Sequence, residues 1–285
     1  MNSFLTRTRL PPSLPAAPRP SQLENLAKPV ILTGSQVPFE RAYNDARRNL
    51  VVSVMLAGTT DIPEVCVFFS DRLMRGNRTV KLDNAALSAF HSPNFPSLAK
   101  LSTSIVVDRS VVLPVPRGRF RAHLDLVTNI AVLRLVPGFD DDVIESMTTS
   151  GSVRAIVLML YGTGNAPGKK SRFISAIRHA VGRGVVVVAV TQCLKGSVEL
   201  DAYAVGASLK DAGVLACGDM TCEATTAKLG YLLSLGLDAG DFAATFRQNL
   251  RGEMSPPPQR SSGGSRMSRA RRELNIRFTE RTSKL

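Results

Sequence analysis

Short, continuous apolar runs alternate along the chain with longer segments whose apolar residues recur at helical spacing. The runs predict buried strands that end in glycine or polar loops, and the longer segments predict helices between them. The predicted strands are Val30 to Thr33, Val65 to Phe69, Ile130 to Leu135, Ala155 to Leu160 and Val185 to Thr191. The predicted helices are Asp45 to Leu56, Ser171 to Val181 and Thr221 to Leu235. Continuous apolar strands joined by crossover helices indicate parallel sheets covered on both faces, so the pattern predicts an α/β fold.

The two ends of the chain lack this pattern. Residues 1–27 are rich in Pro, Ser and Arg without apolar periodicity, and residues 256–285 form a basic tail rich in Pro, Ser and Gly. Both compositions are typical of disordered segments. The predicted folded body therefore runs from residue 28 to 255. Short strand-like runs between Lys100 and Ala122 predict a hairpin that links two α/β domains, residues 28–122 and 123–255.

The net charge of +13 raises the question of nucleic-acid binding. Residues 1–30 and 259–285 together carry +9 of this charge, so the predicted folded body is only weakly basic. A basic tail attracts phosphate without specificity, but the chain shows no interleaving of aromatic and basic residues that would support a dedicated binder. The sequence therefore predicts no specific nucleic-acid partner.

Hydrophobic segments and cysteines exclude two further classes of protein. The longest β-branched stretch, Val185 to Val190, is far shorter than the roughly 20 apolar residues that a spanning helix needs, so no membrane partner is expected. The four cysteines show no C-x-x-C spacing and have no neighbouring partners that would complete a zinc site. We expect reduced, mostly buried thiols.

Ligands bind at the carboxyl ends of strands in open α/β sheets, so the loops after the predicted strands are the places to look for a site. LTGSQVP follows the first strand, and RGNRTVK and SPNFP lie in the long segment after the second. YGTGNAP and TQCLKGSV follow two strands of the second domain, and QNLRGEMSP precedes the tail. These motifs, in this order over residues 28–258, resemble the type I, cytoplasmic-class L-asparaginases.

The resemblance implies two α/β domains with mainly parallel sheets, assembled as a homo-oligomer. It also implies a small-molecule substrate, L-asparagine, whose side-chain amide is hydrolysed to L-aspartate and ammonia. In this family a threonine hydroxyl attacks the amide, activated through a relay of threonine, aspartate and lysine. The resemblance implies no metal and no cofactor.

Lys81 is the relay residue that this chain matches. It is the lysine of RGNRTVK, and the resemblance implies a catalytic role for it. A compact ammonium beside a carboxylate can polarise a chain of proton transfers, and the pKa of a lysine falls readily on burial. Taken without its motif, a lysine in a loop such as Lys81 is usually a solvated cation, and it is the surrounding motif that favours the catalytic role.

Three other residues match the family and have simpler alternatives. Asn165 of YGTGNAP and Tyr203 of DAYAVG lie in segments by which a neighbouring subunit closes the family's active site, which implies substrate binding; ordinary loop packing is the alternative. Asp45 of NDARRN matches the family's S-D-G element. It is expected to cap the predicted helix at its N-terminus, with support of the active site as the alternative.

The threonine motifs of the family are not found in the 285 residues. The family carries T-G-G-T and T-D-T upstream of the segment that matches LTGSQ, and residues 1–27 contain neither. We therefore expect an incomplete N-terminal domain and a chain that is inactive or impaired as it stands. Three interpretations stay open: an asparaginase with a truncated sequence, a catalytically dead homologue that binds or assembles with an active paralogue, and a fragment without function.

The final residues Ser283, Lys284 and Leu285 form the tripeptide S-K-L. This tripeptide is a peroxisomal address when a receptor reads it at a free carboxyl end. We expect a location in peroxisomes or a related organelle, with the peroxisomal import receptor as a partner; the cytoplasm is the alternative.

Overall fold

The computed structural model describes residues 20–166 and 171–256. The chain divides into a first unit that ends at Ser255 and a second unit, Pro256–Leu285, and all described helices and strands belong to the first. The predictions for residues 1–19, for the basic tail beyond residue 256 and for the S-K-L tripeptide lie outside the described residues.

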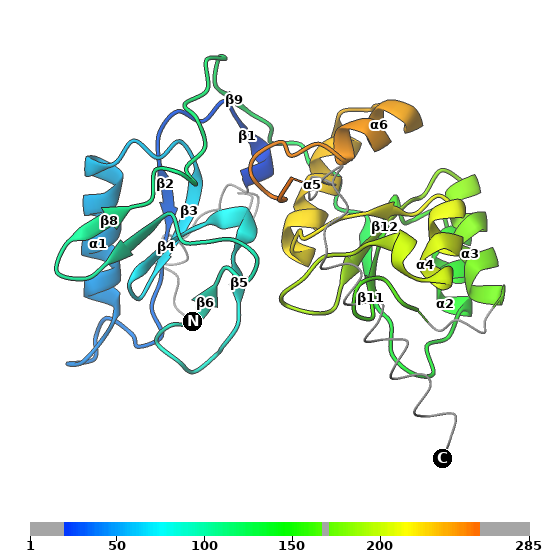
Figure 1. The fold of residues 1–285 in the computed structure, drawn as a ribbon, viewed down its shortest axis with the longest axis horizontal. Coiled ribbons are helices and arrows are strands. Elements are labelled where there is room, and N and C mark those ends of the chain that lie inside the picture. Colours follow the sequence, from blue (N-terminus) through cyan, green and yellow to red (C-terminus); the bar gives the residue numbers. More distant parts are fainter. Residues whose placement is uncertain (1–19, 167–170, 257–285) are drawn as a thin grey trace, which may run out of the picture. The chain divides into compact units, whose positions relative to one another are not determined.

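The N-terminal half is built on a five-stranded sheet with one helix against it (Figure 1). Its strands, in sheet order, are β2 (Val30–Leu32), β3 (Val65–Phe69), β4 (Arg72–Arg75), β7 (Ala99–Leu101) and β8 (Ile105–Val107). Helix α1 (Ala46–Thr59) buries Val52 and Leu56 in the same core as Cys66 and Phe68 of β3. The helix thus covers one face of this sheet.

The α/β class is confirmed, but the expected parallel pairing is wrong for most of this sheet. Only the β2–β3 pair is parallel, whereas β4 is antiparallel to both β3 and β7, and β7 is antiparallel to β8. The physical reason is the connection between β3 and β4, which consists of Ser70 and Asp71 alone. Two residues can join only antiparallel strands, and Ser70 takes the positive φ of 61° that such tight turns require.

The segment from Lys100 to Ala122 does not form a linking hairpin. Strands β7 and β8 pair as a hairpin, but this hairpin is the edge of the N-terminal sheet. The remainder is irregular up to β9 (Arg121–Ala122), which pairs with β1 (Leu23–Glu24). A second small ladder joins β5 (Val80–Lys81) to β6 (Phe90–His91).

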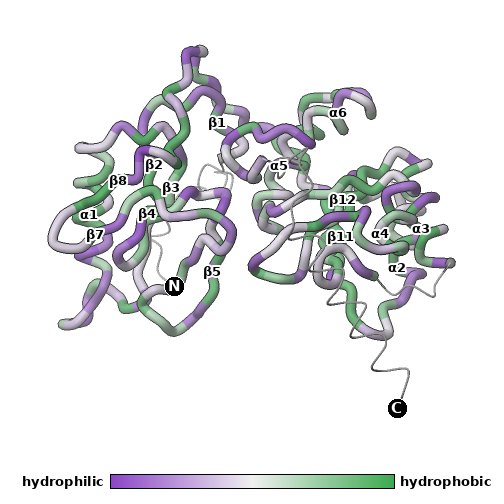
Figure 2. Tube along the Cα trace, viewed as in Figure 1, coloured by the Kyte–Doolittle hydropathy of each residue, from purple (hydrophilic) through white to green (hydrophobic). Residues whose placement is uncertain are grey.

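The C-terminal half carries a fully parallel sheet, as expected. Its four strands, in sheet order, are β10 (Ile130–Arg134), β11 (Ala155–Leu160), β12 (Val186–Thr191) and β13 (Leu215–Ala216). The helices of this half are α2 (Asp142–Thr149), α3 (Ser171–Gly182), α4 (Ala204–Asp211), α5 (Cys222–Ser234) and α6 (Ala239–Phe246). The central strands, β11 and β12, are apolar except for Thr191 at the end of β12, as expected of a sheet that is covered on both faces (Figure 2).

The helices of the C-terminal half divide between the two faces of its sheet. Alternate residues of β11 point to opposite sides, so Ile156 and Leu158 pack with α2, α3 and α4, while Ala155 and Val157 pack with α5 and α6. The result is a three-layer arrangement with the carboxyl ends of β11 and β12 at one edge (Figure 1).

Ordered structure begins ahead of the boundary that the sequence suggested at residue 28. A 3₁₀ turn, Pro20–Gln22, leads into β1, and the main-chain oxygen of Gln22 accepts a hydrogen bond from the amide of His123. Residues 20–27 therefore belong with the linker between the two sheets.

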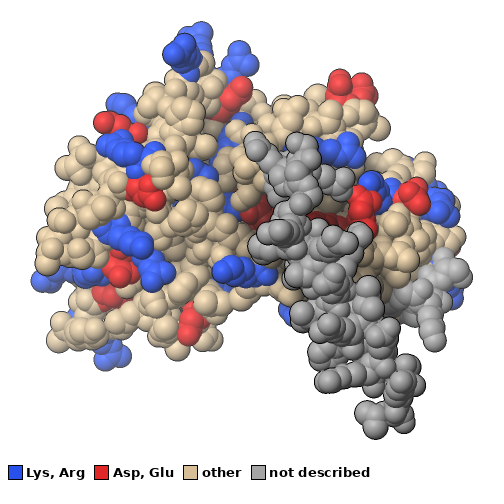
Figure 3. Space-filling model, viewed as in Figure 1, with Lys and Arg blue, Asp and Glu red and all other residues tan. Residues whose placement is uncertain are grey.

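Helix length and surface charge bear on the membrane and nucleic-acid classes. No described helix combines the length and the apolar character that a bilayer span requires. On the face shown in Figure 3, Lys and Arg are interspersed with Asp and Glu. All four cysteines are free thiols, with Cys66 and Cys217 buried and Cys193 exposed, and burial raises the pKa of Cys217 to about 12.

Candidate functional site

The loop after β2 lies against the end of β3. Because these strands are parallel, their carboxyl ends meet, and the Thr33 hydroxyl donates a hydrogen bond to the main-chain oxygen of Phe68 at 2.9 Å. The next residues, Gly34 to Val37, carry the GSQ motif. Thr33 is thus engaged in holding the loop to its neighbouring strand.

Asp45 precedes α1, but its side chain does not cap the helix. Its carboxylate instead accepts hydrogen bonds from the amides of Gln36 and Val37, and from the side-chain amide of Asn49. Asp45 therefore occupies the N-cap position, but the prediction that its side chain caps the helix is wrong. The reason is that the GSQVP loop turns its amides toward Asp45, and a carboxylate that accepts several N–H groups fixes such a loop.

Several buried polar atoms have no hydrogen-bond partner among the described residues. Within the described residues they include Nε2 of Gln36, Oδ1 of Asn49 and Oγ of Ser92. A buried donor or acceptor without a partner costs roughly 1–3 kcal/mol, so native proteins seldom tolerate several together. Gln36 and Asn49 both contact Asp45. Their unpartnered atoms indicate that the GSQ loop can accept hydrogen bonds from, or donate them to, a group that is not part of the described structure.

Lys81 ends the short strand β5, and its side chain is exposed. Two buried arginines of the same motif anchor the segment that leads to Lys81. Arg75 pairs with Glu64, and Arg78 pairs with Asp219 of the C-terminal half. Asp83 lies two residues beyond Lys81. Hydrogen bonds from main-chain amides lower the pKa of Asp83 most, and the charge of Lys81 lowers it further.

Asn165 and Tyr203 belong to neighbouring loops at the carboxyl ends of β11 and β12. The Glu199 amide donates to the Thr163 oxygen at 2.7 Å, which joins the YGTGN loop to the segment that leads to Tyr203. The side chain of Asn165 accepts from the amide of Ala166, and that of Tyr203 is 51% exposed. The structure brings these two loops together and leaves both residues accessible to solvent; their role in binding substrate stays a prediction.

Asn94 connects the strand pair of Lys81 to the C-terminal loops. Its side-chain amide accepts from the amide of Gly196 at 2.9 Å and donates to the main-chain oxygens of Gly196 and Asp219. Asn94 follows β6 by three residues, so the SPNFP motif serves as a bridge between the two sheets. Sequence reasoning did not single out this residue, although SPNFP was among the motifs that it used.

Arg78 makes the most extensive polar contact between the two halves. Its side chain is 1% exposed and donates to the Asp219 carboxylate, to the main-chain oxygens of Asn94 and Glu253, and to the Ser255 hydroxyl. We call Arg78, Asp219 and Ser255 the Arg78 clamp. A second buried pair, Lys228 with Glu253, lies beside it, with Nζ to Oε1 at 2.6 Å. These charges hold the Lys81 segment in register with the C-terminal loops.

The carboxylates of Glu253, which is buried, and Asp219, which is partly buried, stay ionised because the effect of their partners on the pKa outweighs that of burial. Burial alone would raise the pKa of Asp219, but hydrogen bonds from Arg78 and Ser255 hold it below the usual value. Burial likewise opposes ionisation of Glu253, and the charge of Lys228, aided by two main-chain amides, lowers its pKa. Burial also lowers the pKa of Lys228, against the opposing effect of Glu253.

We expect the protein to lose stability in acid through these two carboxylates. Both have a lower pKa in the folded state than the ordinary values of 3.8 for Asp219 and 4.5 for Glu253, so the unfolded chain binds more protons. Their stabilising contribution is present above about pH 4.5 and is lost as the pH falls through the folded values. Denaturant unfolding followed between about pH 7 and pH 3 measures this loss.

The variant Glu253→Gln should be less stable than the original at neutral pH and should lose less stability in acid. Asp211→Asn, which removes an exposed carboxylate, serves as the control and should keep the original pH profile. Identical acid profiles for Glu253→Gln and the original chain would contradict the assignment.

Comparisons with known proteins place this arrangement in a family. Residues 20–113 match the family "Asparaginase, N-terminal", and residues 129–246 match the "Glutaminase/Asparaginase C-terminal domain". The chain is 42% identical to L-asparaginase 1 of Escherichia coli over 236 residues, which cover 82% of this chain and 69% of that relative. It is 40% identical to the 60 kDa lysophospholipase of Homo sapiens, of which it spans 41%.

A solved structure gives the same result for the fold. L-asparaginase I of Vibrio cholerae superposes with a TM-score of 0.77 at 40% sequence identity, over 83% of this chain and 71% of the other. The resemblance inferred from the motifs is confirmed by these matches, which extend it at the amino-terminal side to residue 20. The chain therefore belongs to the asparaginase family.

Proposed function

We propose that this chain provides part of an amidohydrolase site that cleaves the side-chain amide of L-asparagine. The observation that carries the proposal is the 42% identity with an L-asparaginase over 236 residues, which include the anchored Lys81 segment. In support, two buried arginines fix this segment, and the loops of Asn165 and Tyr203 lie together at the edge where α/β sheets bind ligands.

Lys81 has the relay role in this proposal, and the nucleophile is a threonine outside the 285 residues. The family's T-G-G-T and T-D-T motifs are absent from the sequence. Thr33 is a poor substitute because its hydroxyl is committed to the Phe68 oxygen. We therefore propose that the 285-residue chain on its own does not turn over asparagine. Ammonia release, with and without an added segment that carries both motifs, tests this.

A second function, assembly with an active homologue, is favoured by an incomplete face of the N-terminal half. Strand β2 is the terminal strand of its sheet among the described residues. Beside it, α1 exposes an apolar stripe at i, i+1, i+4 and i+5 spacing, formed by Leu50, Val51, Val54 and Met55. Together with Nε2 of Gln36, which has no hydrogen-bond partner among the described residues, these features support a partner that adds a strand and covers α1.

In such an assembly the partner would carry the threonines, and this chain would contribute Lys81 or the closing loops of Asn165 and Tyr203. Oligomerisation, with itself or with a homologue, is part of the proposal. Because the exposed stripe of α1 is apolar, a charge placed at the centre of this stripe should prevent association.

We expect Val54→Lys to block assembly with a co-expressed active asparaginase. Val54 is 64% exposed, so the lysine is tolerated in the free chain but would bury an unpaired charge in the complex. Val106→Lys on β8, at 60% exposure, is the matched control and should assemble normally. Size-exclusion chromatography with light scattering measures both. Equal behaviour of the two variants would argue against α1 as the contact face.

A further inference from the structure

A pocket of about 460 Å³ lies at the linker between the two sheets. Val65, the first residue of β3, and Arg75, the last residue of β4, line it from the N-terminal half. Since β4 runs antiparallel to β3, this is the amino end of β2 and β3, opposite to the end where the Thr33 loop lies. The pocket is therefore separate from the candidate amidohydrolase site.

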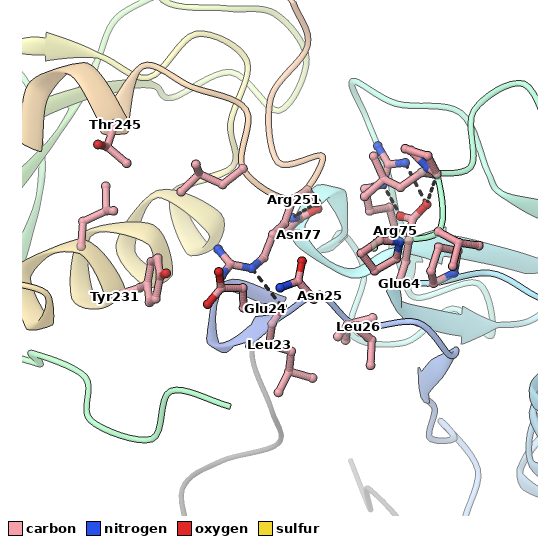
Figure 4. Close-up of a pocket in the computed structure, with 18 of the residues that line it drawn as sticks. Leu23, Glu24, Asn25, Leu26, Glu64, Arg75, Asn77, Tyr231, Thr245 and Arg251 are labelled. Carbon is pink, nitrogen blue, oxygen red and sulfur yellow. Dashed lines mark hydrogen bonds and ion pairs between the residues drawn. The ribbon is translucent and has the colours of Figure 1, made fainter. Parts of the chain in front are cut away.

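More than half of the lining residues are apolar, and polar and charged side chains lie between them. Apolar walls with polar groups that orient a ligand are typical of small-molecule sites of roughly 300–1,000 Å³. Leucines, prolines and valines form its walls, among them Leu23, Leu113, Pro114 and Leu232. Figure 4 shows polar groups between them: Arg251 and Asn77 lie next to each other, and Glu24 and Asn25 lie beside Arg251. Tyr231 lies on one side of this group and the Glu64–Arg75 pair on the other.

Asn77 presents an acceptor that lacks a donor. Asn77 is 6% exposed, and its Nδ2 donates a hydrogen bond to the Arg251 main-chain oxygen at 2.8 Å. That bond fixes the orientation of the amide, because only nitrogen can donate to a carbonyl. The Oδ1 atom is then buried with no partner among the described residues, and an N–H group of a ligand would satisfy it.

Arg251 presents a positioned cation beside this acceptor. Its Nε donates to the Leu23 oxygen at 3.0 Å, and its guanidinium lies 4.7 Å from the centre of the Tyr231 ring. Within the described chain, the hydrogen bonds of this side chain use Nε alone, so its terminal nitrogens are available to an anion. The neighbouring Glu24 is itself engaged by His123 at 3.1 Å, and the other arginine of the pocket, Arg75, is saturated by Glu64 and two main-chain oxygens.

We propose that this pocket binds a small amino carboxylate with an apolar body, such as leucine or a leucine-containing dipeptide. The carboxylate pairs with Arg251, where two parallel N–H bonds suit its geometry. The amino group donates to Oδ1 of Asn77, and the apolar body lies against the leucines and prolines of the linker. The proposal is independent of asparagine hydrolysis because the two groups that hold the ligand, Arg251 and Asn77, are not among the residues proposed to act on asparagine, which are Lys81, Asn165 and Tyr203.

Calorimetric titration of the full chain with leucine and with Leu-Gly tests the proposal. Two analogues separate the polar contacts: 4-methylpentanoate lacks the amino group, and 3-methylbutylamine lacks the carboxylate. We expect leucine or the dipeptide to bind, and each analogue to bind at least about tenfold more weakly, because each lost charge-assisted hydrogen bond leaves a protein group unpaired. An analogue that binds as well as leucine would overturn the assigned contacts, and absence of binding by both probes would overturn the site.

Two variants test the location. Arg251→Gln should weaken binding about tenfold or more, while Arg247→Gln, an exposed arginine outside the pocket, should leave it unchanged. Val115→Trp narrows the pocket from a side chain that is 59% exposed, so it should abolish binding without unfolding the chain. Original affinity in Val115→Trp would place the ligand elsewhere, even if Arg251→Gln failed to fold. Binding is read as heat and not as ammonia, so a failed amidohydrolase assay leaves this result intact.

Discussion

The purified 285-residue chain should release ammonia from asparagine at no more than the background rate, and Lys81→Ala should leave that rate unchanged. A hydroxyl nucleophile needs an activating base, and the groups of such a site act as a unit. Lys81 is the one relay residue that the chain matches, and Thr33 donates its hydroxyl to Phe68. Coupled detection of ammonia measures both rates.

Adding an asparaginase-family segment that carries T-G-G-T and T-D-T, either fused ahead of residue 20 or co-expressed, should create activity. In that setting Lys81→Ala should lower kcat by several orders of magnitude, as removal of one member of a catalytic unit does. Lys81→Arg should fail as well, because an arginine does not give up its proton. Lys100→Ala, which removes an exposed lysine of β7, is the matched control and should keep full activity.

The opposite outcome is equally informative. Asparagine hydrolysis by the unmodified chain that disappears in Lys81→Ala would mean that another hydroxyl, such as that of Thr33 or Ser35, serves as the nucleophile. The proposal that the chain is inactive by itself would then be wrong, while its membership of the family would stand.

The variant Arg78→Met should destabilise the folded chain by roughly 3–5 kcal/mol. The reason is that it leaves the Asp219 carboxylate, which is largely buried, without its cationic partner. The substitution also removes the donors to Asn94, Glu253 and Ser255. Equilibrium unfolding in urea measures the loss.

Arg72→Met is the matched control for this measurement. Arg72 lies in the same segment, but its side chain is 50% exposed and its pair with Asp71 spans 3.8 Å, so its removal should cost at most about 1 kcal/mol. Adding Asp219→Asn to Arg78→Met should recover part of the loss, because an amide costs less to bury than an unpaired carboxylate. Equal effects of the two arginine substitutions would mean that the Arg78 clamp does not stabilise the fold.

The sequence predicted those elements whose apolar pattern is continuous. Strands β3 and β11 have the predicted bounds because both are uninterrupted apolar runs in the interior of a sheet. Strand β4 was missed because its sequence, Arg72 to Arg75, places charge at both ends. Arg75 is nevertheless buried, and its charge is matched by Glu64, which a local pattern cannot show.

The candidate site was predictable in its motifs but not in its contacts. The resemblance pointed to Lys81, Asn165 and Tyr203, yet the residues that join their loops are Arg78 and Asn94. Their partners lie more than a hundred positions away in sequence, as with Arg78 and Asp219. Pairings over such distances depend on the tertiary fold, and a single sequence records only the residue types that take part.

The long sequence separation of the Arg78 clamp has a consequence for the order of folding. Arg78 and Asp219 are 141 positions apart, whereas the C-terminal sheet and its helices lie within residues 130–246 and enclose cores of their own. Contacts between distant positions carry a large loop-closure cost, so they form late. The clamp is then absent from the rate-limiting barrier, and its loss should accelerate unfolding far more than it slows folding. Its contribution to the lifetime of the native state is therefore kinetic as well as thermodynamic.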